Sequence, residues 1–558
     1  AGKLQEIAEI ISPLPVLTSS VLELCRQVAR RQAVTLGEVL KTAVPARAVR
    51  TEQSWLKLDA KQAPGDLSLK GSNQQSKSSR EAQLHYLQSS TVAIQTSDGL
   101  IPSWCERFLE RAKTQLEQGK SVIVALPDFR DFNVFHQLAL TRFGNLVIDY
   151  RSDQTRSRRY ESFLRALATG ASLIVGNRNV LYAPIENLGE IQLWDDGDPA
   201  YQDQSSPYLH TRELALMRQK NDGCNLLIAS FHPSTETTRL LQIGYLQRLE
   251  DERQPPKLTY SDSPERIDSS AISLIRESIK NGNVLIQVSA KGFASGYRCA
   301  DCGSIARCES CHGPLWSARV HEIICRWCGR IHTQIVCHKC NSVRVRQVGT
   351  GSSRTSAEFG TMFPGSRIVE STGEKLVESV SGKGVIVIAS PGAEPRSKSG
   401  YDSVILLDAN RLLSRDSMRS TESAIRNWVN AISLLKPGGR AHLVGVSADL
   451  GSKLSLWSLE ELSLKEYQER VELRLPPAVR IASVVGTDAQ TAQVSESCRI
   501  FPSVELIGPT KQVGTDQWQL LIRYPYLIGL ELADHLKALQ LQLFAGVTVR
   551  SSKTGRSS

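Results

Sequence analysis

Short aliphatic runs alternate with amphipathic segments between about residue 85 and residue 250. Runs of β-branched and aliphatic residues with polar boundaries predict the strands of a sheet. These runs are Ser121–Leu126, Asn145–Asp149, Ser172–Val175, Ile191–Trp194 and Asn225–Ala229. Helical segments such as Trp104–Gln118 lie between most of them, and this alternation is typical of a parallel α/β sheet.

A second segment of the same kind begins with a helix at 270–281 and the strand Val284–Val288. A cysteine-rich insertion interrupts this segment, which resumes at Val348. The elements predicted after it are strands at Val385–Ile388 and Ser403–Leu407, a helix at 417–435 and a strand at Ala441–Val446. Pro437, Gly438 and Gly439 separate the last two elements, because proline and glycine end helices.

The two ends of the chain differ from these segments. Residues 12–50 predict a small helical unit, in which Ser19 and Ser20 cap one helix and Pro45 ends another. Residues 51–82 are polar and predict a linker. Residues 459–558 begin with a helix at 459–472 and contain the alternating strand Trp518–Tyr524, which predicts an α+β domain.

Eight of the 12 cysteines lie in four Cys-x-x-Cys pairs. The pairs are Cys299–Cys302, Cys308–Cys311, Cys325–Cys328 and Cys337–Cys340. Each pair offers two thiolates from one tight turn, and Zn²⁺ prefers four thiolates in a tetrahedron. Four pairs therefore predict two bound Zn²⁺ ions. Glycines at 303, 313 and 329 suit the turns that follow the pairs.

The spacing also predicts which pairs share a metal. Only 5 residues separate the first and second pairs, whereas 13 separate the second and third, which is enough for a hairpin. We therefore expect an inner site at Cys308, Cys311, Cys325 and Cys328. The outer site is then Cys299, Cys302, Cys337 and Cys340. Four protein ligands leave no open position, so both sites are expected to be structural, and no catalytic residue is predicted.

The composition excludes some classes of protein and favours others. A chain of 558 residues with 41% hydrophobic residues is several folded domains and not a disordered protein. Its 67 Lys and Arg against 57 Asp and Glu give a net charge of +10, which fits a polyanionic partner such as nucleic acid. The absence of long apolar runs excludes a membrane span, and paired cysteines without a signal segment favour a reducing cytoplasm.

Two α/β segments with an inserted module indicate the plan of a superfamily 2 helicase, which needs a phosphate-binding loop with glycines and a lysine. The loop should lie between a strand at Thr91–Ile94 and the helix at 104–118, but this stretch has one glycine and no lysine. Asp195 and Asp196 follow the strand Ile191–Trp194, where an acidic pair would hold Mg²⁺. No glutamate stands in the general-base position, so the pair predicts a vestigial nucleotide site, with a solvated acidic loop as the alternative.

Four stretches carry a family resemblance. Gly292-Phe293 precedes the cysteine module, and Val348-Gly-Thr-Gly-Ser-Ser-Arg follows it. The other two stretches begin Ile174-Val-Gly-Asn-Arg and Ala229-Ser-Phe-His-Pro-Ser. With these stretches the chain resembles, over nearly its whole length, the family of primosomal protein N′, the replication restart helicase PriA.

The departures from the family pattern concern the motor. The family's GSGKT loop falls on Ile101–Cys105, and its acidic motif falls on Asp195–Asp198. Its arginine motif falls on Asn430–Pro437, where Leu434 and Pro437 replace two arginines that stabilise charge on the γ-phosphate. The chain is therefore expected to belong to the branch that has lost the helicase motifs. The family's N-terminal 3′-end-binding domain is expected to be absent.

The resemblance implies a multidomain α/β fold with two RecA-like lobes, an inserted double zinc ribbon and a C-terminal α+β domain. The expected units are a winged-helix unit at 12–50, a linker at 51–82, lobe 1 at 83–250, lobe 2 at 270–296 and 341–458, the two-zinc module at 297–340 and the C-terminal domain at 459–558.

The implied function is replication restart: binding forked or branched DNA and helping to reload the replisome, without helicase activity. Expected partners are DNA with single- and double-stranded parts, primosome and helicase-loading proteins, and the single-stranded DNA-binding protein. The chain is expected to be a monomer in the cytoplasm, associated with the nucleoid. The family's winged helix and aromatic-rich loop suggest that the DNA-binding residues are Arg30, Arg31, Lys41, Tyr201 and Arg212. For the helix positions, a solvated helix face is the alternative.

Two other functions stay open at this point. One is an active ATP-dependent 3′→5′ DNA helicase, which the missing lysine and arginines oppose. The other is a zinc-ribbon adaptor that binds only proteins, which would show no fork binding even at low salt.

Overall fold

The computed structural model describes most of the chain, and every structural statement below concerns this part. The described residues are 12, 14–62, 82–96, 99–168, 170–250, 255–289, 296–302, 304, 306–310, 312–313, 315–319, 322–325, 330–348, 352–414, 417–512, 515–542 and 548–551. None of the helices in these ranges is both long and apolar enough to span a membrane.

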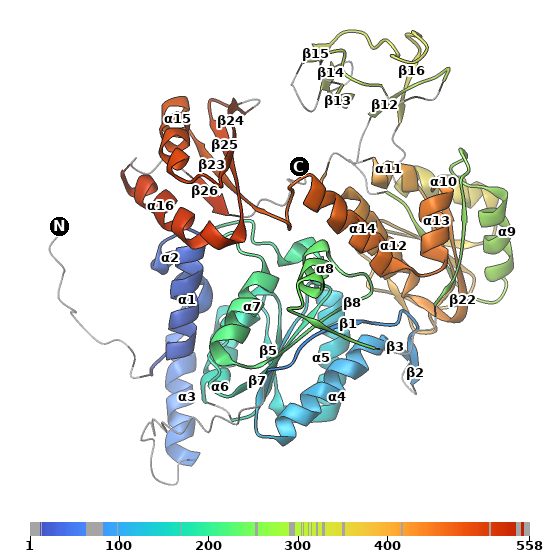
Figure 1. Cartoon of the computed structure of the whole chain (residues 1–558). Helices are drawn as coiled ribbons and strands as arrows, with labels where there is room; N and C mark the ends of the chain where they lie inside the picture. The colour runs from blue at the N-terminus through green and yellow to red at the C-terminus, as the bar shows by residue number, and fades with distance from the viewer. Residues whose placement is uncertain are drawn as a thin grey trace.

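A seven-stranded parallel sheet forms lobe 1, in the order β5-β6-β4-β7-β8-β1-β9 (Figure 1). Its strands are β1 (Leu84–Gln88), β4 (Ser121–Ala125), β5 (Val147–Tyr150), β6 (Leu173–Gly176), β7 (Leu188–Trp194), β8 (Asn225–Ser230) and β9 (Gln247–Leu249). The five predicted strands are confirmed, with boundaries shifted by a few residues. The prediction of a strand at Thr91–Ile94 leading into the helix was wrong, because β1 takes that place.

Helices cover both faces of this sheet, because successive residues of a strand point to opposite faces. Val122 and Val124 of β4 pack with α4 (Ser103–Glu117) and α5 (Phe129–Phe143). Ile123 lies in the opposite core, with α1 (Ser19–Arg31) and α7 (Thr211–Asp222). The other helices of lobe 1 are α6 (Arg156–Ala168) and α8 (Thr235–Gln242).

Lobe 2 is a second parallel sheet, in the order β10-β22-β21-β11-β19-β17. Its strands are β10 (Lys257–Ser261), β11 (Val284–Gln287), β17 (Arg367–Ser371), β19 (Val385–Ala389), β21 (Tyr401–Leu406) and β22 (Leu435–Val444). Its helices are α9 (Ser269–Ser278), α10 (Ser352–Met362), α11 (Ala409–Leu413), α12 (Ser420–Ile432) and α13 (Ala448–Ser455). The expectation of two parallel-sheet lobes is confirmed.

The two lobes share one hydrophobic core. A single cluster of buried residues contains Trp104 and Phe135 of lobe 1 together with Val387 and Trp428 of lobe 2. A hairpin of β2 (Ile94–Thr96) and β3 (Gly99–Ile101) adds to this contact, because the Leu100 N–H donates to the carbonyl of Lys398 at 3.4 Å. Burial of apolar surface between the lobes therefore holds them together in this arrangement.

The cysteine module and the C-terminal domain are antiparallel sheets (Figure 1). The module, inserted between β11 and α10, comprises β12 (Gly296–Cys299), β13 (Leu315–Arg319), β14 (Glu322–Cys325), β15 (Ile331–His332) and β16 (Val345–Val348). The C-terminal domain comprises β23 (Arg480–Gly486), α15 (Asp488–Ser497), β24 (Glu505–Lys511), β25 (Trp518–Tyr524), α16 (Gly529–Gln542) and β26 (Thr548–Ser551). Helix α14 (Leu459–Glu472), expected to open this domain, packs instead against α8 and the shared core through Leu459 and Leu462.

The N-terminal unit consists of α1, α2 (Leu36–Ala43) and α3 (Val49–Gln62). Thr18 and Thr35 cap the first two helices through their side-chain oxygens. Ser19 and Ser20, which were predicted to cap the first helix, are instead its first two residues, and the helix predicted to end at Pro45 ends at Ala43. The predicted linker is helical over 51–62, and residues 63–81 lie outside the described part. The described residues of this unit form helices and no strand.

Candidate functional site

Aromatic rings fill the lobe 1 side of the cleft between the lobes. Trp104, in the first turn of α4, stacks on Trp194 at the end of β7, with ring centroids 4.3 Å apart and planes 13° apart. Phe135 stacks on the indole of Trp104, and Phe231 meets Trp194 edge-on at 4.9 Å. Along the resemblance to the GSGKT loop, Trp104 stands in the place of the lysine. An indole in that position offers stacking surface and no charge for a phosphate.

An arginine from lobe 2 occupies the acidic loop after β7. Arg426 of α12 donates two hydrogen bonds to Asp195, at 2.9 and 2.6 Å, and also pairs with Asp198. The Asn430 amide donates to the same Asp195 carboxylate at 3.1 Å. The Arg426 side chain is only 12% exposed, and the two carboxylates raise the pKa of its guanidinium against the effect of burial. Both acids therefore serve as internal counter-ions.

Asp196 is bound by side chains of lobe 1 and does not share the partners of Asp195. Its Oδ2 accepts hydrogen bonds from Arg212, Ser234 and Thr237 at 2.8, 2.6 and 2.8 Å. Burial raises the pKa of the Asp196 carboxyl, and its Oδ1 has no partner among the described residues. The solvated-loop alternative was wrong, because Asp195 and Asp196 are both buried.

Further ion pairs join the lobes around this centre. Arg419, the N-cap residue of α12, pairs with Glu236 of α8, and Glu422 accepts a hydrogen bond from the Thr235 N–H at 3.2 Å. On the other side, Arg396 reaches Asp131 at 3.4 Å. The lobe interface is thus apolar in its core and cross-linked by charges around it.

The remaining space in the cleft is small. A cavity of about 110 Å³ lies between the lobes, and Trp104, Asp198, Arg396, Arg426 and Asn430 are among its lining residues. Ordinary small-molecule sites enclose about 300–1,000 Å³. A nucleoside triphosphate does not fit this cavity unless the lobes separate.

The outer cysteine site forms as the spacing predicted. The thiols of Cys299, Cys302, Cys337 and Cys340 all lie within 4.8 Å of one another. The sulfur atoms of Cys299 and Cys340 are 3.4 Å apart, and those of Cys302 and Cys337 are 3.5 Å apart. Sulfurs at about 2.3 Å from one zinc lie roughly 3.8 Å apart in a tetrahedron. This group therefore fits one Zn²⁺ ion.

The same backbone hydrogen bond is present at all four cysteine pairs. The N–H of the first cysteine donates to the carbonyl five residues later, at 2.9 Å in each pair: Cys299 to Ser304, Cys308 to Gly313, Cys325 to Arg330 and Cys337 to Ser342. The residue before that carbonyl has a positive φ where it is described, 56° at both His312 and Asn341. In the sequence, Gly303 and Gly329 stand at the equivalent places, whereas Gly313 does not.

The inner site is only partly described. Cys308 and Cys325 are buried in one apolar cluster with Leu315 and Ile335. Cys311 and Cys328 lie outside the described residues, so the inner site remains a prediction.

Two family models match the chain. The "Primosomal protein N C-terminal domain" matches residues 471–551, and the "3'DNA-binding domain (3'BD)" matches residues 1–45. The curated protein "Probable replication restart protein PriA" of Mycobacterium tuberculosis is 31% identical over 91% of this chain and 82% of its own length. The namesake from Mycobacterium leprae is 30% identical over 96% of this chain and 88% of its own length.

The chain belongs to the PriA family. Among solved structures it is similar to the "Structure of RecG bound to three-way DNA junction", with a TM-score of 0.40 and 10% identity over 82% of this chain and 53% of that one.

The match at residues 1–45 corrects one expectation about this PriA-family chain. The family's 3′ DNA-binding domain was expected to be absent, and its family model covers the segment assigned to a winged helix. The match at 471–551 likewise begins after most of α14, in agreement with the packing of that helix on the lobes.

The residues expected to bind DNA have different environments. Tyr201 is fully buried, and its hydroxyl donates to the carbonyls of Ala125 and Trp194 at 2.8 Å. Arg212 is 4% exposed and pairs with Asp196. Both side chains are enclosed by protein and already hydrogen-bonded, so DNA contact by these two residues stays a prediction that would require their exposure.

The three basic residues of the N-terminal unit also differ in whether acidic residues offset their charge. Arg30 pairs with Asp534 at 2.7 Å, and Arg31 lies 3.7 Å from Glu213. Their charges are offset by acids of the C-terminal domain and lobe 1. Lys41 is exposed and has no ion-pair partner in the described part of the chain, so it stays a candidate for DNA contact.

Sequence reasoning missed Arg426 and Trp104. Arg426 lies on the apolar-periodic helix α12, and its partners are in the other lobe, so no local pattern indicates the pair. Trp104 carried a signal, since along the family resemblance it falls on the position of the motif lysine.

We predict that Arg426→Ala destabilises the lobes by about 3–5 kcal/mol, because it leaves Asp195 and Asp198 buried without a counter-ion. Denaturant unfolding followed by tryptophan fluorescence measures the change. The control is Arg499→Ala, which removes an exposed arginine paired with Glu496 and should cost less than about 1 kcal/mol. Equal effects in the two variants would refute a structural role of Arg426.

We predict two zinc ions per chain and one after replacement of the outer ligands. The double substitution Cys302→Ser and Cys340→Ser removes half of the outer ligand set and should lower the zinc content from two to one, measured by atomic emission. The control, Cys25→Ser, changes a buried thiol outside the module and should leave the content at two. A wild-type content of one zinc ion per chain would contradict the prediction of an inner site and leave only the outer site.

Proposed function

We propose that this chain is a non-catalytic replication restart protein, which binds forked DNA and helps to reload the replisome without hydrolysing ATP. Membership of the PriA family supports the restart role, since the curated relatives are named for replication restart. The match of residues 1–45 to a 3′ DNA-binding domain and the net charge of +10 support DNA as the partner.

The observation that carries the proposal is the pairing of Arg426 with Asp195 and Asp198. A motor of this plan needs a free carboxylate after β7 to hold Mg²⁺ through the reaction. Here that carboxylate is neutralised by an arginine from the opposite lobe, and exchanging the arginine for Mg²⁺ would leave a cation uncompensated in a dry interface. In this proposal Asp195 and Asp198, paired with Arg426, join the lobes in place of a nucleotide.

Trp104 supports the same conclusion from the other side of the cleft. Opening the phosphate site requires unstacking Trp104 from Trp194, both of which are 2% exposed or less. A stacked aromatic pair contributes about 0.5–1.5 kcal/mol beyond the burial of its surface. Nucleotide binding would therefore have to break this stacking and part of the hydrophobic core that the lobes share.

In this proposal the lobes are a rigid support for DNA-binding and protein-binding modules. The zinc module projects from lobe 2, and the C-terminal domain lies against the N-terminal unit (Figure 1). Two structural zinc ions would hold the module in one shape. The proposed surroundings are the cytoplasm and its DNA, with primosome and helicase-loading proteins as partners.

The deciding experiment measures fork binding and ATP turnover on the same sample. We expect fork DNA to bind with an affinity that falls steeply with salt, as phosphate contacts require. We expect ATP hydrolysis with saturating fork DNA to equal the buffer blank, and calorimetry with Mg²⁺ and ATP to give no heat of binding.

The matched control for contaminating ATPase is Asp195→Asn, which keeps the size of the side chain and removes its charge. Turnover that is equal in wild type and variant comes from a contaminant. Turnover that is present in the wild type and lost in the variant would establish an active motor. Failure of the wild type to bind fork DNA at low salt would favour the protein-only adaptor.

A further inference from the structure

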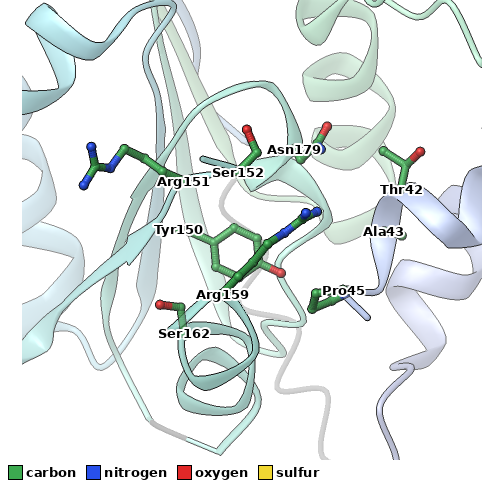
Figure 2. Close-up of a pocket in the computed structure, with 9 residues that line it drawn as sticks. All are labelled: Thr42, Ala43, Pro45, Tyr150, Arg151, Ser152, Arg159, Ser162 and Asn179. Carbon is green, nitrogen blue, oxygen red and sulfur yellow. The ribbon is translucent and has the colours of Figure 1, made fainter. Parts of the chain in front are cut away.

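The cysteines outside the zinc module are shielded from reagents in solution. At most 3% of each of these residues is exposed: Cys25, Cys105, Cys224 and Cys498. The cavity between α2 and lobe 1, shown in Figure 2, encloses about 10 Å³, which is room for about one water molecule, and its lining residues include no cysteine. Burial raises the pKa of the Cys25 thiol to about 11 and that of the Cys224 thiol to about 12. These thiols are therefore protonated at neutral pH and react slowly, because the thiolate is the reactive form.

Two ligands of the outer zinc site are in contact with solvent. Among the described cysteines, the exposed ones are Cys302 and Cys340, one from each pair of that site. The other two ligands, Cys299 and Cys337, are only 1% exposed. The module projects from lobe 2 in Figure 1, so the exposed pair can be reached from solution. A cysteine that coordinates zinc is held as the thiolate, and these two positions therefore combine access with the reactive form.

Each exposed cysteine lies beside a buried cysteine of the opposite pair. The sulfur of Cys340 is 3.4 Å from that of Cys299, and the sulfur of Cys302 is 3.5 Å from that of Cys337. Closing either contact to a disulfide bond brings the two sulfurs together by roughly 1.4 Å. Either bond would join two different Cys-x-x-Cys turns, which are the same turns that one zinc ion joins.

We propose that the outer zinc site is oxidised by peroxides, which form one disulfide between its two cysteine pairs and release the Zn²⁺ ion. The exposed thiolate of Cys340 or Cys302 attacks hydrogen peroxide, the O–O bond breaks, and the sulfur becomes a sulfenic acid while the leaving hydroxide takes a proton from solvent. The neighbouring buried thiolate then attacks this sulfur, the S–O bond breaks, and the second hydroxide also leaves as water. Two thiolates thus lose two electrons, and these electrons with two protons reduce one peroxide to two water molecules.

Oxidation would remove the metal and leave the base of the module joined. Cys299 ends β12 and is the register partner of Val345 in β16, and these are the first and last strands of the module. The two remaining thiolates are too few for a structural zinc site, which takes four ligands. A bond between Cys299 and Cys340 would still tie β12 to the segment that leads into β16. The inner site should react more slowly, because its described ligands Cys308 and Cys325 are buried.

The test adds hydrogen peroxide to the full chain loaded with zinc. A colorimetric zinc indicator follows the release of metal, and mass spectrometry of alkylated peptides locates the disulfides. We expect one Zn²⁺ ion per chain to be released with formation of a Cys299–Cys340 or Cys302–Cys337 disulfide, while Cys25 stays reduced. A thiol reductant with added zinc should restore the original zinc content. A zinc content that does not change in excess peroxide would overturn the proposal, and so would disulfides confined within a single Cys-x-x-Cys pair.

The matched variant carries Cys302→His and Cys340→His, which keep four zinc ligands but remove both exposed thiolates, since imidazole also binds Zn²⁺. Its rate of zinc release in peroxide should fall by about tenfold or more. The control Cys498→Ser removes a buried thiol of the C-terminal domain and should release zinc at the rate of the wild type.

Release at the wild-type rate from the zinc-loaded histidine variant would overturn the proposal. If the histidine variant binds less zinc than the wild type before oxidation, the disulfides located in the wild type decide the question. Because none of these measurements uses DNA or ATP, their outcome does not depend on the proposed function.

Discussion

The guanidinium group of Arg426 is largely withdrawn from water between two carboxylates of the opposite lobe, and the arrangement of the lobes depends on it. Removing any one of the three charges leaves the others in a low-dielectric interface, where an unpaired charge costs several kcal/mol. Because Trp104, Trp194 and Trp428 close the same interface, little water can enter to compensate. The chain's own residues therefore join the two lobes through both a shared core and buried ion pairs.

Most of the fold could be predicted from local patterns, and the exceptions have identifiable causes. The run at β4, Ser121–Ala125, is buried at every position and was placed correctly. Strand β1 was missed because it contains His85 and Gln88, whose polar side chains interrupt the apolar run. Gln88 is buried all the same, since its amide donates to the carbonyl of Phe231 at 3.1 Å, a partner that no local pattern reveals.

Among the candidate sites, too, some could be predicted from local sequence patterns and others depend on distant partners. The outer zinc ligands follow from spacing, because two short turns must converge on one ion. The pairing of Arg426 could not be predicted, since 231 residues separate it from Asp195. Tyr201 and Arg212 look like surface residues in sequence, and acceptors supplied by distant strands allow them to be buried.

The ion pair between Arg30 and Asp534 joins positions 504 residues apart in the chain. On a ribosome that adds about 5–20 residues per second, roughly 25–100 s pass between synthesis of the two partners. Throughout that interval the surface of α1 that receives α16 stays uncovered, although the lobes between them can fold. The N-terminal unit is therefore completed only when nearly the last segment of the chain has been synthesised. A product truncated at its C-terminus leaves a surface of α1 uncovered, at the opposite end of the sequence.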